Sequence, residues 1–271
     1  MTRLRPSGAG PRGHGTGALT RLYDVTCAWT VRILRARYQQ SILGWAWAVV
    51  QPMATVAIFS IVFTRVVHVD TGPIPYVVFS YTSLVPWSLL AGALPDMTGS
   101  MVANIGVVTK VDFPREALPI GAFVARLTDF AVSFAVLVLL VVAYGLPVTW
   151  TWLIFVPIAL LVQSCLIVGL GLGCAALNVF YRDVDPMLRL VLQLWFYASP
   201  ILYPIDLVPT EWRWFYLLNP MAGIIETYRA ALLANQPPDP SLGVAALTSM
   251  IIGFVGYWLF KRVEGRFADV V

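Results

Sequence analysis

Long stretches without Asp, Glu, Lys or Arg dominate the hydrophobic pattern of the chain. They cover residues 38–64, 71–95, 130–181 and 240–260. Because roughly 20 helical residues cross a bilayer core about 30 Å thick, each stretch is long enough to span a membrane. The stretch 130–181 is more than twice that length, so it must form a helical hairpin. Pro147 lies inside this stretch, and a proline in the interior of a helix breaks it. We therefore predict an outer turn at 146–150.

This pattern predicts an all-α membrane protein with six transmembrane helices. We expect spans near residues 42–66, 75–94, 119–144, 152–178, 187–207 and 242–261. A seventh helix is expected ahead of them at 19–40, where apolar residues recur every three or four positions and charged residues gather on the opposite face. A helix with a basic face and a Trp-containing apolar face is typical of the membrane surface. A soluble core helix is the alternative, but the chain offers no soluble domain for it to pack on.

The ends and the charge distribution indicate an orientation. Residues 1–18 are rich in Gly, Arg and Pro and lack the apolar core of a signal peptide, so we expect a disordered cytosolic tail. The domains are then the tail 1–18, the interface helix 19–40 and the membrane domain 41–271. With the N-terminus inside, most of the 18 Lys and Arg fall in inner segments, as retention of positive loops requires. Both termini are therefore expected in the cytosol, in a multi-pass protein of the cytoplasmic (inner) membrane.

Composition excludes several classes of protein. Only 12% of the 271 residues are charged, against about a quarter in soluble domains, which excludes an ordinary water-soluble enzyme. The net charge of +4 could suggest nucleic-acid binding, but the basic residues are distributed among membrane-flanking loops rather than over one soluble face. No nucleic-acid partner is expected.

The residues that enzymes need are scarce. The two histidines are far apart, at His14 and His68, and no His, Cys and carboxylate cluster has metal-ligand spacing. Neither a GxSxG elbow nor a Walker A motif occurs. Cys27, Cys165 and Cys174 have no paired spacing and are interpreted as packing groups. We therefore expect no catalytic residue, metal or cofactor in this chain.

Two features inside the spans stand out. Arg126 and Asp129 are three residues apart on the third span, so they share one helical face. They form either a salt-bridged pair or part of a proton or substrate relay, since ionisable groups in a membrane are candidates for function. Gly169 and Gly173 form a GxxxG pair, which favours close helix packing over phosphate binding.

The connection between the fifth and sixth spans is unusual. The segment SPILYP at 199–204 interrupts an apolar helix with Pro200 and Pro204, and a second apolar stretch at 212–234 is broken by Asn219-Pro220. Each piece is too short to cross the membrane, which predicts re-entrant or surface-lying helices. Non-helical backbone at membrane depth requires protein or water to satisfy it, so we expect an outward-facing vestibule.

Two inner loops, 95–119 and 179–186, combine aromatic residues with paired charges. They could be solvated connectors, but the pattern suits a docking surface for a cytosolic protein. Since the chain contains no ATPase motif, a partner that supplies one is a concrete possibility.

An ordered set of motifs extends this interpretation. The motifs are RYQQSILG (37–44) with Trp47 and QP (51–52), LVPW (84–87), KVDFPRE (110–116), LNVFYRDV (177–184), SPILYP (199–204) and NPMAGIIE (219–226) with Tyr228 and Arg229. Each is weak alone, but in this order they resemble the permease subunit of ABC-2 type polysaccharide exporters, which move O-antigen, teichoic acid and related lipid-linked glycans.

The resemblance implies six spans after an amphipathic interface helix, and a homodimer whose interface forms a channel for an undecaprenyl-linked glycan. It also implies two copies of a separate nucleotide-binding subunit, which holds the ATP and Mg. Surrounding membrane lipid completes the expected set of partners.

The resemblance assigns roles to residues as well. The expected ATPase-coupling residues are Lys110, Phe113, Pro114, Arg115, Glu116, Tyr181, Arg182 and Asp183. The expected outer gate consists of Pro200, Pro204, Asn219, Pro220, Glu226 and Arg229. Flat apolar faces for sugar rings could come from Phe59, Phe63, Trp195, Phe196, Tyr197 and Tyr203, with hydrogen bonds from Gln193. These aromatic residues either line the channel or face lipid at the membrane interface.

Two other functions stay open on the sequence. One is an ABC-2 permease for a drug or an ordinary lipid, with the same fold and another cargo. The other is a membrane-embedded glycosyl or acyl transferase acting on lipid-linked sugars. A transferase should show an acidic or His cluster in an outer loop, whereas Asp206, Glu211 and Glu226 are separated.

Overall fold

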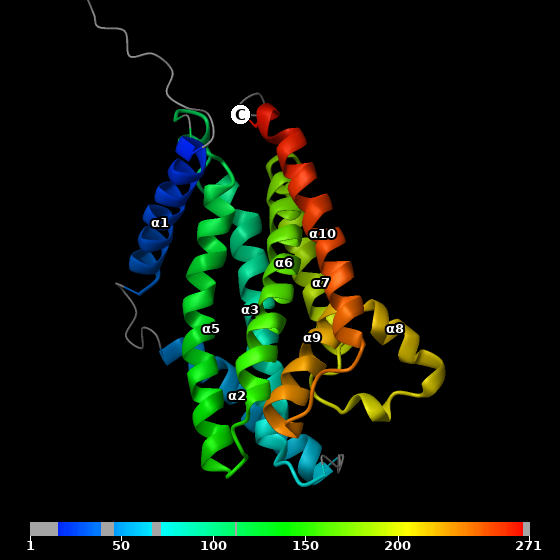
Figure 1. Ribbon diagram of the computed structural model, residues 1–271. Helices are drawn as coiled ribbons and strands as arrows, with labels where there is room; N and C mark the ends of the chain where they lie inside the picture. Colours follow the sequence, from blue (N-terminus) through cyan, green and yellow to red (C-terminus); the bar gives the residue numbers. More distant parts are fainter. Residues whose placement is uncertain (1–15, 39–45, 67–71, 112, 268–271) are drawn as a thin grey trace, which may run out of the picture.

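The computed structural model describes residues 16–38, 46–66, 72–111 and 113–267, and all regular structure within them is helical. Four helices are long and apolar enough to cross a membrane: α3 (Tyr76–Ala103), α5 (Ala117–Ala143), α6 (Trp150–Phe180) and α10 (Ser241–Val263). Figure 1 shows them side by side as the centre of a bundle. Its upper end carries α4 (Ile105–Val108), the start of α1 and the end of α10, and its lower end carries the turn between α5 and α6.

The turn between α5 and α6 confirms the predicted hairpin. The chain reverses at residues 144–149, where Gly145 has a φ of 72° that favours glycine. Pro147 lies within this turn, so the long apolar stretch divides where the proline predicted.

Two shorter helices occupy the remaining predicted spans. α2 (Trp47–Ile61) continues into a π-helical turn (Val62–Val66), and α7 (Val184–Tyr197) has 14 residues. At 1.5 Å per residue α7 extends only about 21 Å, so the prediction of a fifth span reaching residue 207 was wrong. The helix stops because Pro200 cannot donate a backbone hydrogen bond, and the chain turns there with Ile201 N donating to Ser199 O at 2.7 Å.

The central helix α3 is longer than the sequence predicted. We expected a span ending at 94 and an inner loop from 95, but α3 continues through Pro95 to Ala103. Its last turns carry Leu94, Met97 and Met101, all fully buried, so packing against neighbouring helices outweighs the local effect of the proline. The inner loop therefore starts at Asn104, and Asp96 lies within the bundle.

The amphipathic helix α1 (Thr16–Tyr38) begins three residues before its predicted start and packs on α5. The side chain of Trp29 lies against Gly121, where a Cβ would come within 3.2 Å of Trp29 Cδ1. Thr30 Oγ1 donates to Gly121 O at 3.3 Å. Figure 1 shows α1 running beside the upper part of α5, so its inner face is buried on protein rather than on lipid alone. The predicted tail up to residue 15 and the boundary at 40–41 lie outside the described residues.

Helices α6 and α10 approach closely, as the glycine spacing predicted. A Cβ on Gly169 would lie 2.5 Å from the Cα of Gly253. Gly256 faces the backbone of Gly169 in the same way, and Gly173 lies within ordinary contact distance of Gly256. The absence of side chains lets the two backbones touch, which is the packing role expected of a GxxxG pair.

The connection from α7 to α10 contains several short helices. After 3₁₀ turns at Ile205–Leu207 and Thr210–Trp212 come α8 (Arg213–Leu218), α9 (Pro220–Arg229) and a π-helical turn (Ala230–Ala234). α9 is almost entirely buried, whereas α8 projects from the side of the bundle (Figure 1). The predicted break at Asn219-Pro220 is confirmed.

Candidate functional site

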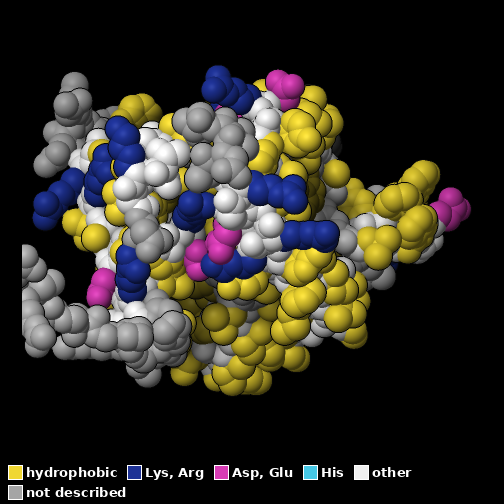
Figure 2. Space-filling model, turned by 90° about the horizontal axis from the view of Figure 1, so that it is seen from above, with side chains coloured by type: hydrophobic (Ala, Val, Ile, Leu, Met, Phe, Trp, Pro, Cys, Tyr) yellow, Lys and Arg dark blue, Asp and Glu magenta, His cyan; other side chains and the backbone are white. Residues whose placement is uncertain are grey.

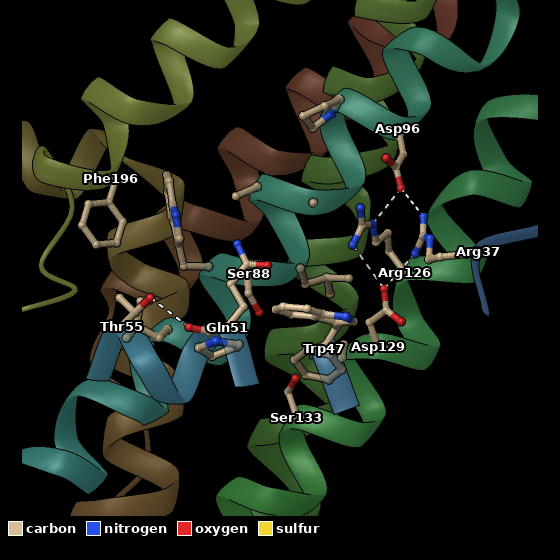
Figure 3. A pocket seen from close by; sticks show the side chains of 18 of the residues that line it. Arg37, Trp47, Gln51, Thr55, Ser88, Asp96, Arg126, Asp129, Ser133 and Phe196 are labelled. Carbon is tan, nitrogen blue, oxygen red and sulfur yellow. Dashed lines mark hydrogen bonds and ion pairs between the residues drawn. The ribbon is translucent and has the colours of Figure 1, made fainter. Parts of the chain in front are cut away.

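A cavity of about 560 Å³ lies between α2, α3, α5 and α7. Trp47, Gln51 and Thr55 line it from α2, Ser88 lines it from α3, and Phe196 from α7. Figure 3 shows these side chains around the space, with aromatic rings beside hydrogen-bonding groups. Such a mixed lining is unusual within apolar helices and can hold water or a polar ligand.

Four charged side chains close one side of this cavity (Figure 3). Asp96 Oδ2 accepts from Arg37 and, at 2.7 Å, from Arg126 Nε. Asp129 Oδ2 accepts from Arg37 Nη1 at 2.8 Å and from Arg126 Nη1 at 3.2 Å. We call these residues the charge ring. Charges of opposite sign alternate around the ring. Its two arginines balance its two aspartates, so its formal charge is zero.

The charge ring contains the predicted Arg126–Asp129 pair and two residues that sequence reasoning missed. Asp96 was placed in an inner loop that begins at Pro95, and Arg37 was counted among the inner basic residues and within the RYQQSILG motif, without a role in a site. Asp96 lies seven residues before the end of α3, about 10 Å along the helix axis from its upper end. Gly92, one turn before Asp96, leaves room for Arg126, because a Cβ there would lie 3.2 Å from the guanidinium.

The predicted channel aromatics largely come together. Phe59 lies 5.9 Å from Phe63 and 6.4 Å from Phe196, measured between ring centroids. Trp87 contacts two neighbouring aromatic residues of α7, with ring centroids 5.6 Å from Phe196 and 6.1 Å from Trp195. We call Phe59, Phe63, Trp87, Trp195 and Phe196 the aromatic row. It joins α2 and its π-helical turn to α3 and α7. Trp87 was not among the predicted channel residues, although it belongs to the LVPW motif.

Of the other predicted channel residues, Tyr197 contacts the row, with its ring centroid 5.3 Å from that of Phe196, whereas Tyr203 lies apart from it. Gln193 and Tyr197 are exposed and border a smaller cavity of about 220 Å³ against Trp87 and Phe196. Tyr203 donates to Tyr197 O at 3.2 Å, and its Oη lies 2.6 Å from that of Tyr216. Tyr203 therefore belongs with the segment after α7 rather than with the aromatic row.

Arg229 holds that segment in place. Its side chain is almost fully buried, with Nη2 donating to Ile201 O at 3.0 Å and Nη1 to Tyr203 O at 3.4 Å. Nη1 also pairs with Glu226 Oε1 at 2.7 Å, and the guanidinium lies 3.8 Å from the centroid of the Phe79 ring. One side chain thus joins α9, α3 and the chain after α7.

Asn219 makes a second connection. Its Oδ1 accepts from Met221 N at 3.0 Å, which caps α9, and from Trp195 Nε1 at 2.8 Å. Its Nδ2 donates to Ser199 Oγ at 2.9 Å. Pro220 occupies the first turn of α9, where no backbone donor is needed. Among the other predicted gate residues, Pro200 is buried in the turn after α7 and Pro204 directly precedes the 3₁₀ turn Ile205–Leu207.

The eight predicted coupling residues lie at the upper end and divide into two groups. Lys110, Tyr181, Arg182 and Asp183 are exposed. Figure 2 shows this end, where Lys and Arg side chains are more abundant than Asp and Glu.

The second coupling group contacts the protein itself. Phe113, Pro114 and Arg115 are half-buried and Glu116 is buried. Arg115 Nη1 donates to the carbonyl of Glu264, and Lys261 Nζ pairs with Glu116 Oε1 at 2.8 Å. These residues hold the loop to the end of α10 rather than extending from it.

Within the described part of the chain, no group of three or more His, Cys, Asp or Glu is arranged to hold a metal ion. All three cysteines are free thiols.

The chain shares its sequence pattern with known proteins. Residues 25–233 match the family described as ABC-2 type transporter. An O-antigen export system permease protein, RfbA, from Klebsiella pneumoniae is 29% identical over 251 residues, which cover 92% of this chain and 96% of that protein. The RfbA protein of Myxococcus xanthus is 29% identical over 244 residues, covering 89% and 92%. The polysialic acid transport protein KpsM of Escherichia coli is 25% identical over 248 residues, covering 86% and 91%. With a match over more than half its length and an apolar helical bundle, the chain belongs to the ABC-2 type transporter family.

Proposed function

We propose that this chain is the permease subunit of an ABC exporter that moves a polyprenyl-linked polysaccharide of the O-antigen, teichoic acid or cell-wall galactan type across the cytoplasmic membrane. Relatives named as O-antigen and polysialic acid permeases match almost the whole chain and support this cargo class. The structural observation that supports the proposal most directly is the cavity, which combines aromatic faces with hydrogen-bonding groups between apolar helices.

The proposal includes six spans, with α2 and α7 added to the four long helices. The upper end faces the cytosol because basic residues are concentrated there (Figure 2), including Lys110, Arg182 and Arg262 near the ends of α4, α6 and α10. α7 is too short to cross the bilayer alone, and the segment 199–234 completes the outer half of that span as a re-entrant element. Both termini are then cytosolic.

We further propose that two copies of the chain assemble along the side formed by α2 and α7. Ile58 and Ile61 on α2 and Leu194 on α7 are exposed apolar residues. The same helices expose the polar side chains of Gln51 and Arg189. Facing lipid, these polar groups would lose hydrogen bonds with water. A second copy would cover the apolar residues and leave a watered path beside the cavity, where the aromatic row offers flat faces to sugar rings.

Energy would come from a separate ATPase subunit, two copies of which hold ATP and Mg²⁺ outside this chain. The exposed residues Lys110, Tyr181, Arg182 and Asp183 provide the docking surface. ATP binding would draw the two docking surfaces together and favour one access state of the dimer, because a ligand shifts an equilibrium only by its differential affinity for the two states.

Reconstitution tests this function directly. The chain and its cognate ATPase, purified together, are placed in vesicles with a fluorescent polyprenyl-linked glycan on the ATPase side. We expect the glycan to become inaccessible to a glycosidase on that side only with ATP, and not with a Walker-lysine variant of the ATPase. The proposal would be overturned if the glycan crossed without the ATPase, or if the chain alone hydrolysed ATP or altered the sugar.

A further inference from the structure

The last described residues of the chain form a compact support at the upper end. α10 ends in a 3₁₀ turn, Glu264–Arg266, followed by Phe267, whose side chain is fully buried. The ring centroid of Phe267 lies 5.6 Å from that of Phe260 and 5.8 Å from that of Phe180. Phe180 is the last residue of α6 and directly precedes the exposed segment 181–183. The C-terminal turn therefore packs under one of the two proposed docking segments.

The same turn holds the other docking segment. Arg115 donates to the Glu264 carbonyl, and its guanidinium carbon lies 5.9 Å from the centroid of the Phe267 ring. Lys261 Nζ bridges Glu116 Oε1 at 2.8 Å and Glu264 Oε2 at 3.1 Å. These contacts link residues nearly 150 positions apart in the sequence.

One buried cluster lies beneath both segments. Besides Phe260 and Phe267 it includes Val108 on α4 and Leu118 on α5, and Phe113 packs against it. The exposed Lys110 is thus flanked by a buried residue two positions before it and by a packed one three positions after it. Neither docking segment rests on its own helix alone.

We propose that the C-terminal turn positions both ATPase-docking segments, so that residues 110–116 and 181–183 move as one body, with Phe267 and Lys261 as positioning residues. This inference rests on the proposed function, in which the upper end contacts an ATPase. Loops with few buried contacts open locally at low free energy. Such a loop would deform when the ATPase moved against it, and the movement would not reach the membrane helices. Segments fixed to a packed cluster transmit a displacement because packed cores repack between discrete arrangements rather than bending continuously.

The first experiment needs no ATPase. In the full-length chain with its three cysteines replaced by serine, spin labels at Lys110→Cys and Arg182→Cys report the distance between the two segments. We expect one narrow distance distribution in the parent and a clearly broader one after Phe267→Ala. Phe254→Ala removes the same atoms from an exposed ring on α10, the helix that precedes the C-terminal turn, and should leave the distribution narrow. An unchanged distribution in Phe267→Ala would overturn the inference.

The second experiment measures coupling in the unlabelled complex with the cognate ATPase. Stimulation is the ratio of the ATP hydrolysis rate with glycan to the basal rate without it. Phe267→Ala should lower this ratio about fivefold while the complex still assembles. Phe267→Leu keeps a large apolar side chain in the buried cluster, so its stimulation should stay near that of the parent. Lys261→Glu should lower stimulation, and adding Glu116→Lys should restore it. Stimulation equal to the parent in both Phe267→Ala and Lys261→Glu would contradict the inference.

The two proposals fail in different ways. If the parent chain binds no ATPase, the proposed function fails, while the spin-label distances still decide whether the C-terminal turn holds the two segments together. If the complex forms and transports glycan, but neither the spin-label distances nor the stimulation of ATP hydrolysis change in Phe267→Ala, only the positioning role of the C-terminal turn is refuted.

Discussion

Arg37 Nη1 lies 2.8 Å from Asp129 Oδ2, which ties the last turn of α1 to the middle of α5. The contact joins residues 92 positions apart and completes a ring in which each arginine meets both carboxylates. A helix that could have lain free on a membrane surface is thereby fixed to the bundle, beside the cavity.

The charge ring should contribute measurably to stability. Arg126→Ala removes one arginine partner from both Asp96 and Asp129 in a partly buried site, so we expect the free energy of unfolding to fall by about 1–3 kcal/mol. Thermal unfolding in detergent measures this as a lower Tm. Arg126→Lys should fall between, because an ammonium keeps the charge but cannot donate in the same fork. Arg35→Ala, an exposed arginine of α1, is the control, and an equal loss in both alanine variants would refute the role of the ring.

Arg229 should keep the outer segment closed. Arg229→Ala removes the donors to Ile201 O and Tyr203 O, so the turn containing the buried Ser199 should open more often. In a cysteine-free chain carrying Ser199→Cys, we expect faster labelling by a membrane-impermeant maleimide, by about tenfold.

Arg213→Ala provides the matched control for this experiment. Arg213 lies on the same outer connection and donates to Val208 O at 3.2 Å, but it does not contact the turn after α7. Equal labelling rates in the Arg229 variant and in the parent would show that other contacts hold the segment.

Trp87 should matter for transport. It joins Phe196 and Trp195 in the aromatic row and lines the cavity, so Trp87→Ala should slow ATP-dependent glycan export about fivefold if ring stacking contributes about 1 kcal/mol to passage. Protein amount and Tm identify any folding defect. Phe254→Ala, an exposed aromatic of α10, should leave export unchanged. Normal export in a stable Trp87→Ala variant would remove the aromatic row from the transport path.

The contact of α6 with α10 leaves no room for a methyl group at Gly169. Gly169→Ala would place a Cβ 2.5 Å from Gly253 Cα, so the helices must separate, and we expect a destabilisation of about 1–3 kcal/mol. Gly243→Ala, on α10 with nothing within 4 Å of the new Cβ, is the comparison. Similar thermal stability of the two variants would mean that the backbones are not in contact in the membrane.

Much of the architecture could be predicted from the sequence, because crossing a bilayer imposes a length and a composition on each helix. The charge-free stretches located α3, α5, α6 and α10, Pro147 located the hairpin turn, and Asn219-Pro220 located the start of α9. Two boundaries failed for different reasons. Pro95 stays helical because Met97 and Met101, on the turns after it, are fully buried by neighbouring helices. α7 ends before Pro200, a local signal through which the predicted fifth span had been continued, and Arg229 and Asn219 then hold the chain that follows.

The candidate site was predicted only in part, for a related reason. The aromatic residues of α7 and the Arg126–Asp129 pair were visible because they are neighbours in sequence. Arg37, Trp87 and Asp96 were missed as site residues because their partners lie on other helices. Similarly, the predicted docking motif at 110–116 contains residues that face a partner and residues that hold the loop to α10, and no spacing rule separates them.

The sequence by itself determined that this chain lies in a membrane, where its helices turn, and to which family it belongs, because hydrophobic length and motif order are local properties of a chain. Only the tertiary structure decided which charges meet, which aromatic rings form a row and which loop residues are free. Those outcomes depend on how helices pack across the bundle, where a single glycine or a buried methionine sets the approach of segments that are far apart in the chain.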